Sequence, residues 1–126
     1  MKSLWLAVLF AASAPPALAH HSFAAEYDAS KPVKITGVIT RMEWTNPHAW
    51  IYLDARSPDG AITHWGFSAN PPGVLMRRGL RREDMKPGTV IQVEGFRAKD
   101  GSANGYGRKV TFGDGRSFYI SGDTSK

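Results

Sequence analysis

The sequence contains no cysteine in its 126 residues. That absence excludes disulfide bonds, iron–sulfur clusters, cysteine zinc sites and thiol redox chemistry, so core packing alone must hold the fold. A phosphate-binding loop, an ordered serine–histidine–aspartate set and a paired acidic motif are also missing from the sequence. There is no internal repeat and no low-complexity tract. Nothing in the sequence therefore argues strongly for an enzyme.

Long apolar runs are equally scarce, and the clearest one covers residues 4–14. It is too short to span a bilayer, which needs about 20 residues, and this argues against a retained membrane anchor. Lys2 precedes the run, and Ala17-Leu18-Ala19 after it fits a cleavage site with small residues. Cleavage after residues 12–14 is disfavoured because a proline would follow the cut. We therefore predict a cleaved secretory signal over residues 1–19, with export to the periplasm or, alternatively, to the medium.

Removal of 19 of the 126 residues leaves 107, which is enough for one domain with a modest core. Lys2 is the only charged residue removed, so the net charge falls from +5 to +4. This mildly basic balance favours anionic partners without requiring them. We predict an arm over residues 20–32, a single folded domain over 33–122 and a tail over 123–126.

Alternating, β-branched segments predict that most of the mature chain forms strands. The arm is predicted to be extended, with a short turn at residues 23–27, and Gly37 predicts a bulge or bend in the first strand. Asp59-Gly60 predicts a hairpin turn. Strands are expected over residues 33–44, 49–56, 61–68, 89–98, 106–112 and 117–120, with a short helix between residues 70 and 79 and a helical turn at 82–85.

Three strands, a short helix and two or three further strands follow the order of a Greek-key barrel of the OB type, in which the helix lies between the third and fourth strands. We therefore predict a mostly β fold: a small OB-like barrel of five or six strands. An antiparallel β-sandwich is the alternative. OB barrels bind ligands on the face of their second and third strands and on the adjoining loops.

The predicted cleavage places His20 at the mature N-terminus, followed by His21. A free α-amine has an unperturbed pKa of about 7.7–8.0, so it is partly neutral near pH 7 and can bind a metal ion together with the His20 imidazole. His48 or His64 would supply a further imidazole if the arm folds back. Such a nitrogen-rich set suits Cu(II) best among divalent ions. The four histidines are therefore the candidate metal ligands.

The alternative interpretation of the histidines is structural. The first two would form a polar chain end, His48 would hydrogen-bond within a turn, and His64 would be half-buried in its strand. No short motif links the four residues, and histidines without such a motif usually have structural roles.

Aromatic residues gather in the first three predicted strands. Trp50 and Tyr52 share one face of the second strand, and Trp65 and Phe67 share one face of the third. Asn46, Trp50, Tyr52 and Trp65 are therefore candidate ligand-binding residues. They would serve a metal-free module that binds a peptide, a glycan or an envelope protein.

Basic residues beside aromatic residues also occur in proteins that bind single-stranded nucleic acid. The basic set here comprises Arg77, Arg78, Arg81, Arg82, Arg97, Lys99, Arg108 and Lys109. Export removes most nucleic acid from reach, and interleaved acidic residues are typical of a solvated face. Nucleic-acid binding is therefore disfavoured.

Seven short segments stand out: HHSFA at residues 20–24, YD at 27–28, TNPHAW at 45–50, LMRRG at 75–79, KPG at 86–88, VEG at 93–95 and RAKDG at 97–101. Together they resemble an uncharacterised family of small exported bacterial proteins, classed only as a domain of unknown function. The resemblance covers nearly the whole mature chain. It implies that His20 to Phe23 and Asn46 to His48 are hallmark positions, and it brings no activity, substrate or cofactor.

The sequence thus supports three functions, in descending order. The first is an exported periplasmic protein that binds Cu(II) for handling or delivery. Three mature methionines, Met42, Met76 and Met85, form no cluster in the sequence, which argues against a Cu(I) relay. The second function is the metal-free interaction module, and the third is a copper-dependent oxidative enzyme or enzyme subunit.

Overall fold

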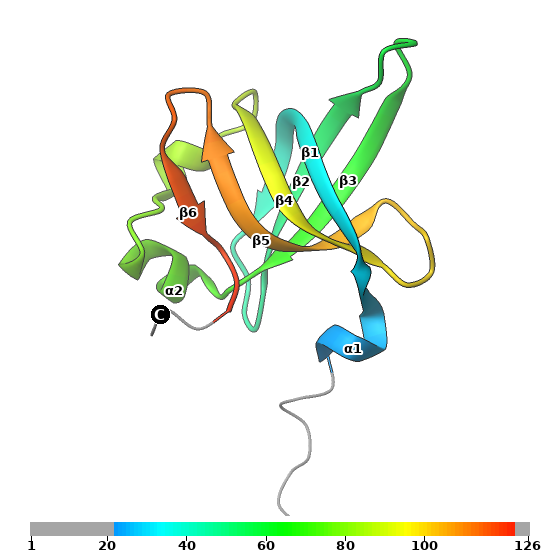
Figure 1. Ribbon diagram of the computed structural model, residues 1–126. Helices are drawn as coiled ribbons and strands as arrows, with labels where there is room; N and C mark the ends of the chain where they lie inside the picture. The colour runs from blue at the N-terminus through cyan, green and yellow to red at the C-terminus, as the bar shows by residue number, and fades with distance from the viewer. Residues whose placement is uncertain (1–21, 123–126) are drawn as a thin grey trace, which may run out of the picture.

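The computed structural model describes residues 22–122 (Figure 1). The predicted signal peptide, His20, His21 and the predicted tail lie outside this range. Within it, no helix is long and apolar enough to cross a membrane.

Strands dominate the described residues, as predicted. The elements are α1 (Ser22–Glu26), β1 (Tyr27–Glu43), β2 (Ala49–Arg56), β3 (Ile62–Ala69), α2 (Pro72–Arg77), the 3-10 turn η1 (Arg82–Met85), β4 (Val90–Ala98), β5 (Asn104–Phe112) and β6 (Ser117–Tyr119). The prediction of a mostly β fold with a short helix between the third and fourth strands is confirmed. Apart from β1, whose start was predicted six residues too late, the predicted strand limits agree with the structure to within two residues.

The six strands form one sheet in the order β3-β2-β1-β4-β5-β6, and neighbours in this order are antiparallel. A further, parallel pairing joins β3 to β5, with Gly66 opposite Asn104 and Ser68 opposite Tyr106. This pairing closes β1 to β5 into a ring of strands and leaves β6 outside it, paired only with β5.

The first described residues differ from the expectation. The predicted turn at residues 23–27 is the helix α1, and β1 begins at Tyr27, within the predicted arm. Tyr27 pairs with Ala98 and Pro32 with Phe96, with an irregular register between them. The residues between are polar or small and largely exposed, so no apolar alternation marks this part of β1 in the sequence.

Gly37 lies where β1 exchanges one partner for another. Residues up to Val38 pair with β4, and residues from Val38 onward pair with β2. A Cβ atom at Gly37 would lie 2.5 Å from the carbonyl oxygen of Asp54. The glycine is therefore required by the close approach of β2, while the bulge itself lies between Ile39 and Arg41.

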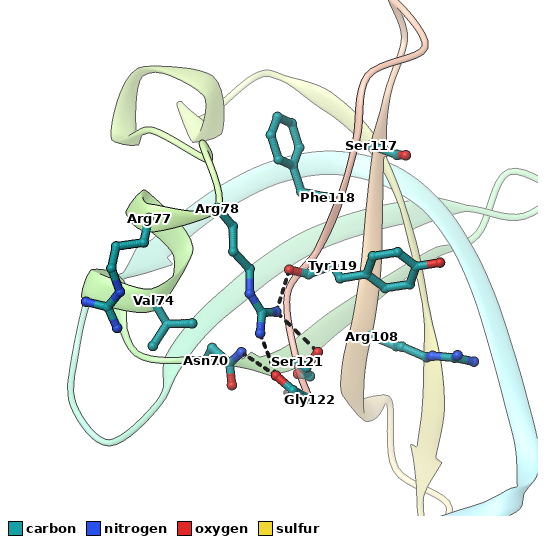
Figure 2. Close-up of a pocket in the computed structure, with 10 residues that line it drawn as sticks. All are labelled: Asn70, Val74, Arg77, Arg78, Arg108, Ser117, Phe118, Tyr119, Ser121 and Gly122. Atoms are coloured by element: carbon teal, nitrogen blue, oxygen red, sulfur yellow. Dashed lines mark hydrogen bonds between the residues drawn. The ribbon is translucent and has the colours of Figure 1, made fainter. Parts of the chain in front are cut away.

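The last described residues are held by Arg78, which directly follows α2 (Figure 2). Its Nη1 donates to the carbonyl oxygens of Tyr119, at 2.8 Å, and Ser121, at 3.3 Å, and its Nη2 donates to that of Gly122, at 2.5 Å. The arginine therefore satisfies carbonyl groups of β6 and the segment after it. An unpaired strand edge with free carbonyls would be a template for aggregation.

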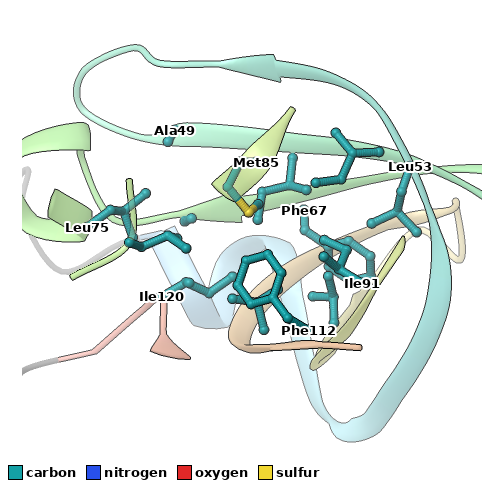
Figure 3. Packing of buried hydrophobic residues seen from close by; sticks show 14 of the residues in the cluster. Ala49, Leu53, Phe67, Leu75, Met85, Ile91, Phe112 and Ile120 are labelled. Atoms are coloured by element: carbon teal, nitrogen blue, oxygen red, sulfur yellow. The ribbon is translucent and has the colours of Figure 1, made fainter. Parts of the chain in front are cut away.

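The core lies inside the ring of strands and under α2 and η1 (Figure 3). Alternate residues of β2 are buried, as expected for a strand with one face in the core. Side chains that are less than 2% exposed include Phe67, Ile39, Ile51, Leu53, Leu75, Leu80, Met85, Ile91, Ile120, Val93 and Val110. Each contributes roughly 1.5–3 kcal/mol when fully buried, which is how a chain without cysteine holds its fold.

Candidate functional site

His48 lies in the loop between β1 and β2, and its imidazole is fixed by one hydrogen bond. Its Nδ1 is 3.2 Å from the carbonyl oxygen of Ala69, the last residue of β3. A carbonyl oxygen only accepts, so Nδ1 is the donor of this hydrogen bond, and the tautomer that makes it has its lone pair on Nε2. Thr45 Oγ1 donates to the His48 carbonyl oxygen at 2.8 Å and holds the loop. An oriented imidazole with a free Nε2 is the arrangement found in histidine metal ligands.

His64 lies on β3 and pairs with an acidic residue of β2. Its Nδ1 is 2.5 Å from Oδ1 of Asp54, directly across the hairpin. The side chain is 81% exposed, so it is more open than the half-buried residue of the structural interpretation. The Asp54 carboxylate orients the His64 ring, just as the Ala69 carbonyl oxygen orients the His48 ring. The Nε2 atom of His64 has no hydrogen-bond partner among the described residues.

The two histidines belong to different places. The β2–β3 register pairs Ala49 with Ala69 and Asp54 with His64. Five residues of strand separate these two pairs, which corresponds to about 17 Å at roughly 3.3 Å per residue. One metal ion cannot therefore be bound by both His48 and His64.

The first described residues approach the end of the sheet that carries His48. Tyr27 OH donates to Ser68 Oγ at 3.2 Å, next to the Ala69 carbonyl that holds His48. The N–H of Lys99 donates to the carbonyl oxygen of Glu26 at 2.9 Å and ties α1 to β4. Figure 1 shows α1 and the β1–β2 loop at the same end of the sheet. Burial raises the pKa of the Tyr27 hydroxyl above its ordinary value, so it stays protonated as the donor.

Aromatic contacts dock α1 on this end. The Phe23 ring lies 4.9 Å from that of Tyr106 and 5.7 Å from that of Phe96, both edge-on, and 5.9 Å from that of Tyr27. The Tyr27 and Tyr106 rings are 5.7 Å apart. The sequence patterns did not predict this cluster, although Phe23 and Tyr27 lie four positions apart, the spacing of neighbours on a helix.

The predicted aromatic face is only partly present. Trp50 and Tyr52 stack on the outer face of β2, with ring centroids 6.4 Å apart, and the Arg41 guanidinium lies 4.3 Å from the Tyr52 centroid. Trp65 was predicted to join them, but it is 7% exposed and lies on the opposite, core face. The register explains the difference, because Trp65 is opposite Leu53 and both point inward.

Asn46, the remaining ligand-binding candidate, lies in the exposed loop before His48. Its peptide bond to Pro47 is cis. No group of three histidine, aspartate or glutamate side chains within residues 22–122 is arranged to hold a metal ion. His20 and His21 lie outside the described residues, so the part of the site assigned to them has no described geometry.

A pocket of about 1090 Å³ lies between α2 and β6, near the end of the sheet that carries Ala69 and His48 (Figure 2). Arg77, Arg78 and Arg108 line it together with Asn70 and Phe118. Asn70 follows Ala69 directly, and its carbonyl oxygen accepts from the N–H of Ala49 at 3.4 Å. These arginines were predicted to lie on a solvated face, and no pattern in the sequence brings the three together.

Comparison with known proteins finds one family. The model of a family described as "Family of unknown function (DUF6152)" matches residues 8–108, most of the chain. This agrees with the resemblance to an uncharacterised domain of unknown function. No curated protein and no solved structure matches the chain.

Proposed function

The chain belongs to DUF6152, a family of unknown function, and on that premise we propose a function from its own residues: the exported protein binds Cu(II). The ligands are the α-amine and imidazole of His20 with Nε2 of His48, and His21 is the alternative donor of the arm. The role is handling or delivery in the periplasm.

The orientation of His48 is the observation that carries this proposal. The Ala69 carbonyl, 3.2 Å from Nδ1, leaves Nε2 as the basic nitrogen. A hydrogen-bond acceptor on the other ring nitrogen fixes the orientation of a histidine ligand and raises the basicity of its ligating nitrogen. His48 therefore offers a preorganised imidazole in an exposed loop, where an approaching ion meets no steric barrier from the core.

The docking of α1 supports the participation of the arm. Ser22 begins α1, and His20 precedes Ser22 by two residues, so the chain between their Cα atoms spans at most about 7 Å. Tyr27 and Phe23 anchor α1 to residues beside Ala69. The entropic cost of bringing the mature N-terminus to His48 is thereby reduced, because most of the arm is already ordered.

The chemistry of the donors favours Cu(II). An amine and imidazoles form a nitrogen set that holds Cu(II) more tightly than other divalent first-row ions. The chain has no cysteine, so it has no thiolate ligand for Cu(I). Of its thioethers, that of Met85 is buried in the core, whereas Met76 is 46% exposed.

We also infer that the fold is of the OB type. The ring order β1-β2-β3-β5-β4, with α2 between β3 and β4, supports this assignment. An OB barrel would place the β1–β2 loop, which contains His48, among its ligand-binding loops.

Calorimetry with Cu(II) tests the proposal on protein that begins at His20. A second sample with one extra residue before His20 removes the N-terminal chelate. We expect one-to-one binding that is weakened in the second sample and weakened about tenfold or more by His48→Ala. His64→Ala is the matched control and should leave the affinity unchanged, because His64 lies about 17 Å away along the sheet. Equal affinity of both samples, or no effect of His48→Ala, would contradict the proposed site.

A metal-free interaction module is the second candidate, favoured by the outward stack of Trp50 and Tyr52. Arg41 over the Tyr52 ring extends this surface with a cation. Quenching of tryptophan emission by an envelope peptide or a glycan, unchanged by a chelator and lost in Trp50→Ala, would favour this function over copper binding. Quenching that a chelator abolishes would contradict it.

A further inference from the structure

We propose that the pocket between α2 and the last strand binds a small organic anion, with a carboxylate or phosphate group on an apolar body. The pocket encloses about 1090 Å³ and is lined by residues of α2, β5, β6 and the segment after β6. Figure 2 shows Arg78 at its centre, with Arg77 and Arg108 on either side.

The described lining of the pocket carries positive charge. Within residues 22–122 it includes three arginines and no aspartate or glutamate. Among the described residues, none of these three lies within 4.0 Å of a carboxylate oxygen, whereas Arg41, Arg81 and Arg116 each do. Clefts lined by one sign of charge concentrate the opposite ion.

Arg78 also keeps donors that the fold does not use. A guanidinium has five N–H groups, and three of those of Arg78 are directed at main-chain carbonyl oxygens. Its Nε is buried and has no hydrogen-bond partner among the described residues. One Nη2 hydrogen remains for a ligand oxygen, and a hydrogen bond from a guanidinium to a carboxylate or phosphate oxygen is stronger than one between neutral groups.

The rest of the lining indicates an organic ligand. Val74 and Phe118 provide apolar surface beside the arginines, and the Tyr119 side chain is 57% exposed at the edge. A purely inorganic anion would leave this apolar surface in water. An aromatic or aliphatic body would cover it while the acidic group contacts Arg78.

This site is independent of copper, because none of its lining residues is a proposed copper ligand. Metal-free protein is therefore the sample for the test, and amide NMR is the readout. The probes are phenyl phosphate and benzoate, with benzyl alcohol as the neutral analogue and inorganic phosphate as the analogue without an apolar body. We expect saturable shifts over the millimolar range at Arg78 and at residues 119–122 with the two aromatic anions.

Charge-removing variants complete the test. The double variant Arg77→Gln/Arg108→Gln should weaken binding on the order of tenfold, since it removes charge-assisted contacts. The two single variants show which side of Arg78 the acidic group occupies. The control Arg56→Gln/Lys86→Gln loses the same charge outside the pocket and should bind as the parent does. Absence of saturable shifts, equal binding of benzyl alcohol, or equal losses in both double variants would overturn the proposal.

Discussion

Replacement of Phe23 by alanine tests whether the docked arm builds the copper site. Phe23 is the side chain through which α1 meets the sheet, with three aromatic rings between 4.9 and 5.9 Å from its own. The helix has only five residues and cannot persist alone, because isolated helices of this length are unstable in water. Removal of the ring should therefore release α1 while β1 remains paired with β4.

The magnitude follows from the three ring contacts. Each aromatic pair contributes about 0.5–1.5 kcal/mol, and because neighbouring contacts are not additive we take roughly 2 kcal/mol for the loss of docking. If copper binds only to the docked arm, its affinity falls by at most the docking free energy. A loss of about 2 kcal/mol corresponds to roughly 30-fold in the dissociation constant.

Two measurements check the outcome. Hydrogen exchange should accelerate at the amide of Lys99, which donates to the Glu26 carbonyl, and the Cu(II) dissociation constant should rise by up to about 30-fold. Ile35→Ala is the control, because it also truncates a half-buried side chain of the β1–β4 pair, away from α1. Faster exchange with unchanged copper affinity would refute the link between docking and binding, and unchanged exchange would refute the role of Phe23.

Two further predictions concern stability. Gly95→Ala should lower the free energy of unfolding in urea by about 3 kcal/mol or more, because its Cβ would lie 1.9 Å from the Tyr106 carbonyl oxygen. The control Gly113→Ala, whose Cβ would meet nothing within 4 Å, should change it by less than about 0.5 kcal/mol. Equal effects of the two variants would contradict the clash at Gly95. Asp84 accepts a hydrogen bond from the N–H of Arg81 and contacts Arg116, and these interactions hold the pKa of its carboxyl below the ordinary value. A folded-state pKa below the unfolded value of about 3.9 stabilises the protein fully above that pH, and this contribution is lost as the pH falls through the folded-state pKa. Asp84→Asn should therefore reduce the slope of unfolding free energy against pH on the acid side. An unchanged slope would contradict this prediction.

Local patterns predicted most strands because each has one face in the core. The alternation over β2 and the Asp59-Gly60 turn, with Gly60 at a φ of +88°, determine that hairpin from nearby residues alone. The early part of β1 was not predicted because its exposed polar residues show no alternation, and because its partners in β4, Ala98 for Tyr27 and Phe96 for Pro32, are more than sixty residues away. Trp65 points inward because the β2–β3 register places it opposite Leu53, and this register cannot be predicted from residue composition.

The same register decides which histidine can join the arm. His48 and His64 are alike in the sequence, and in the structure each has its Nδ1 held by an oxygen, one from Ala69 and one from Asp54. Chemistry alone therefore does not distinguish them. The hydrogen bond from Tyr27 to Ser68 does, because it fixes the arm beside Ala69, at the opposite end of the hairpin from Asp54. If Cu(II) binding were lost in His64→Ala and kept in His48→Ala, the claim that the arm brings the mature N-terminus to His48 would be refuted.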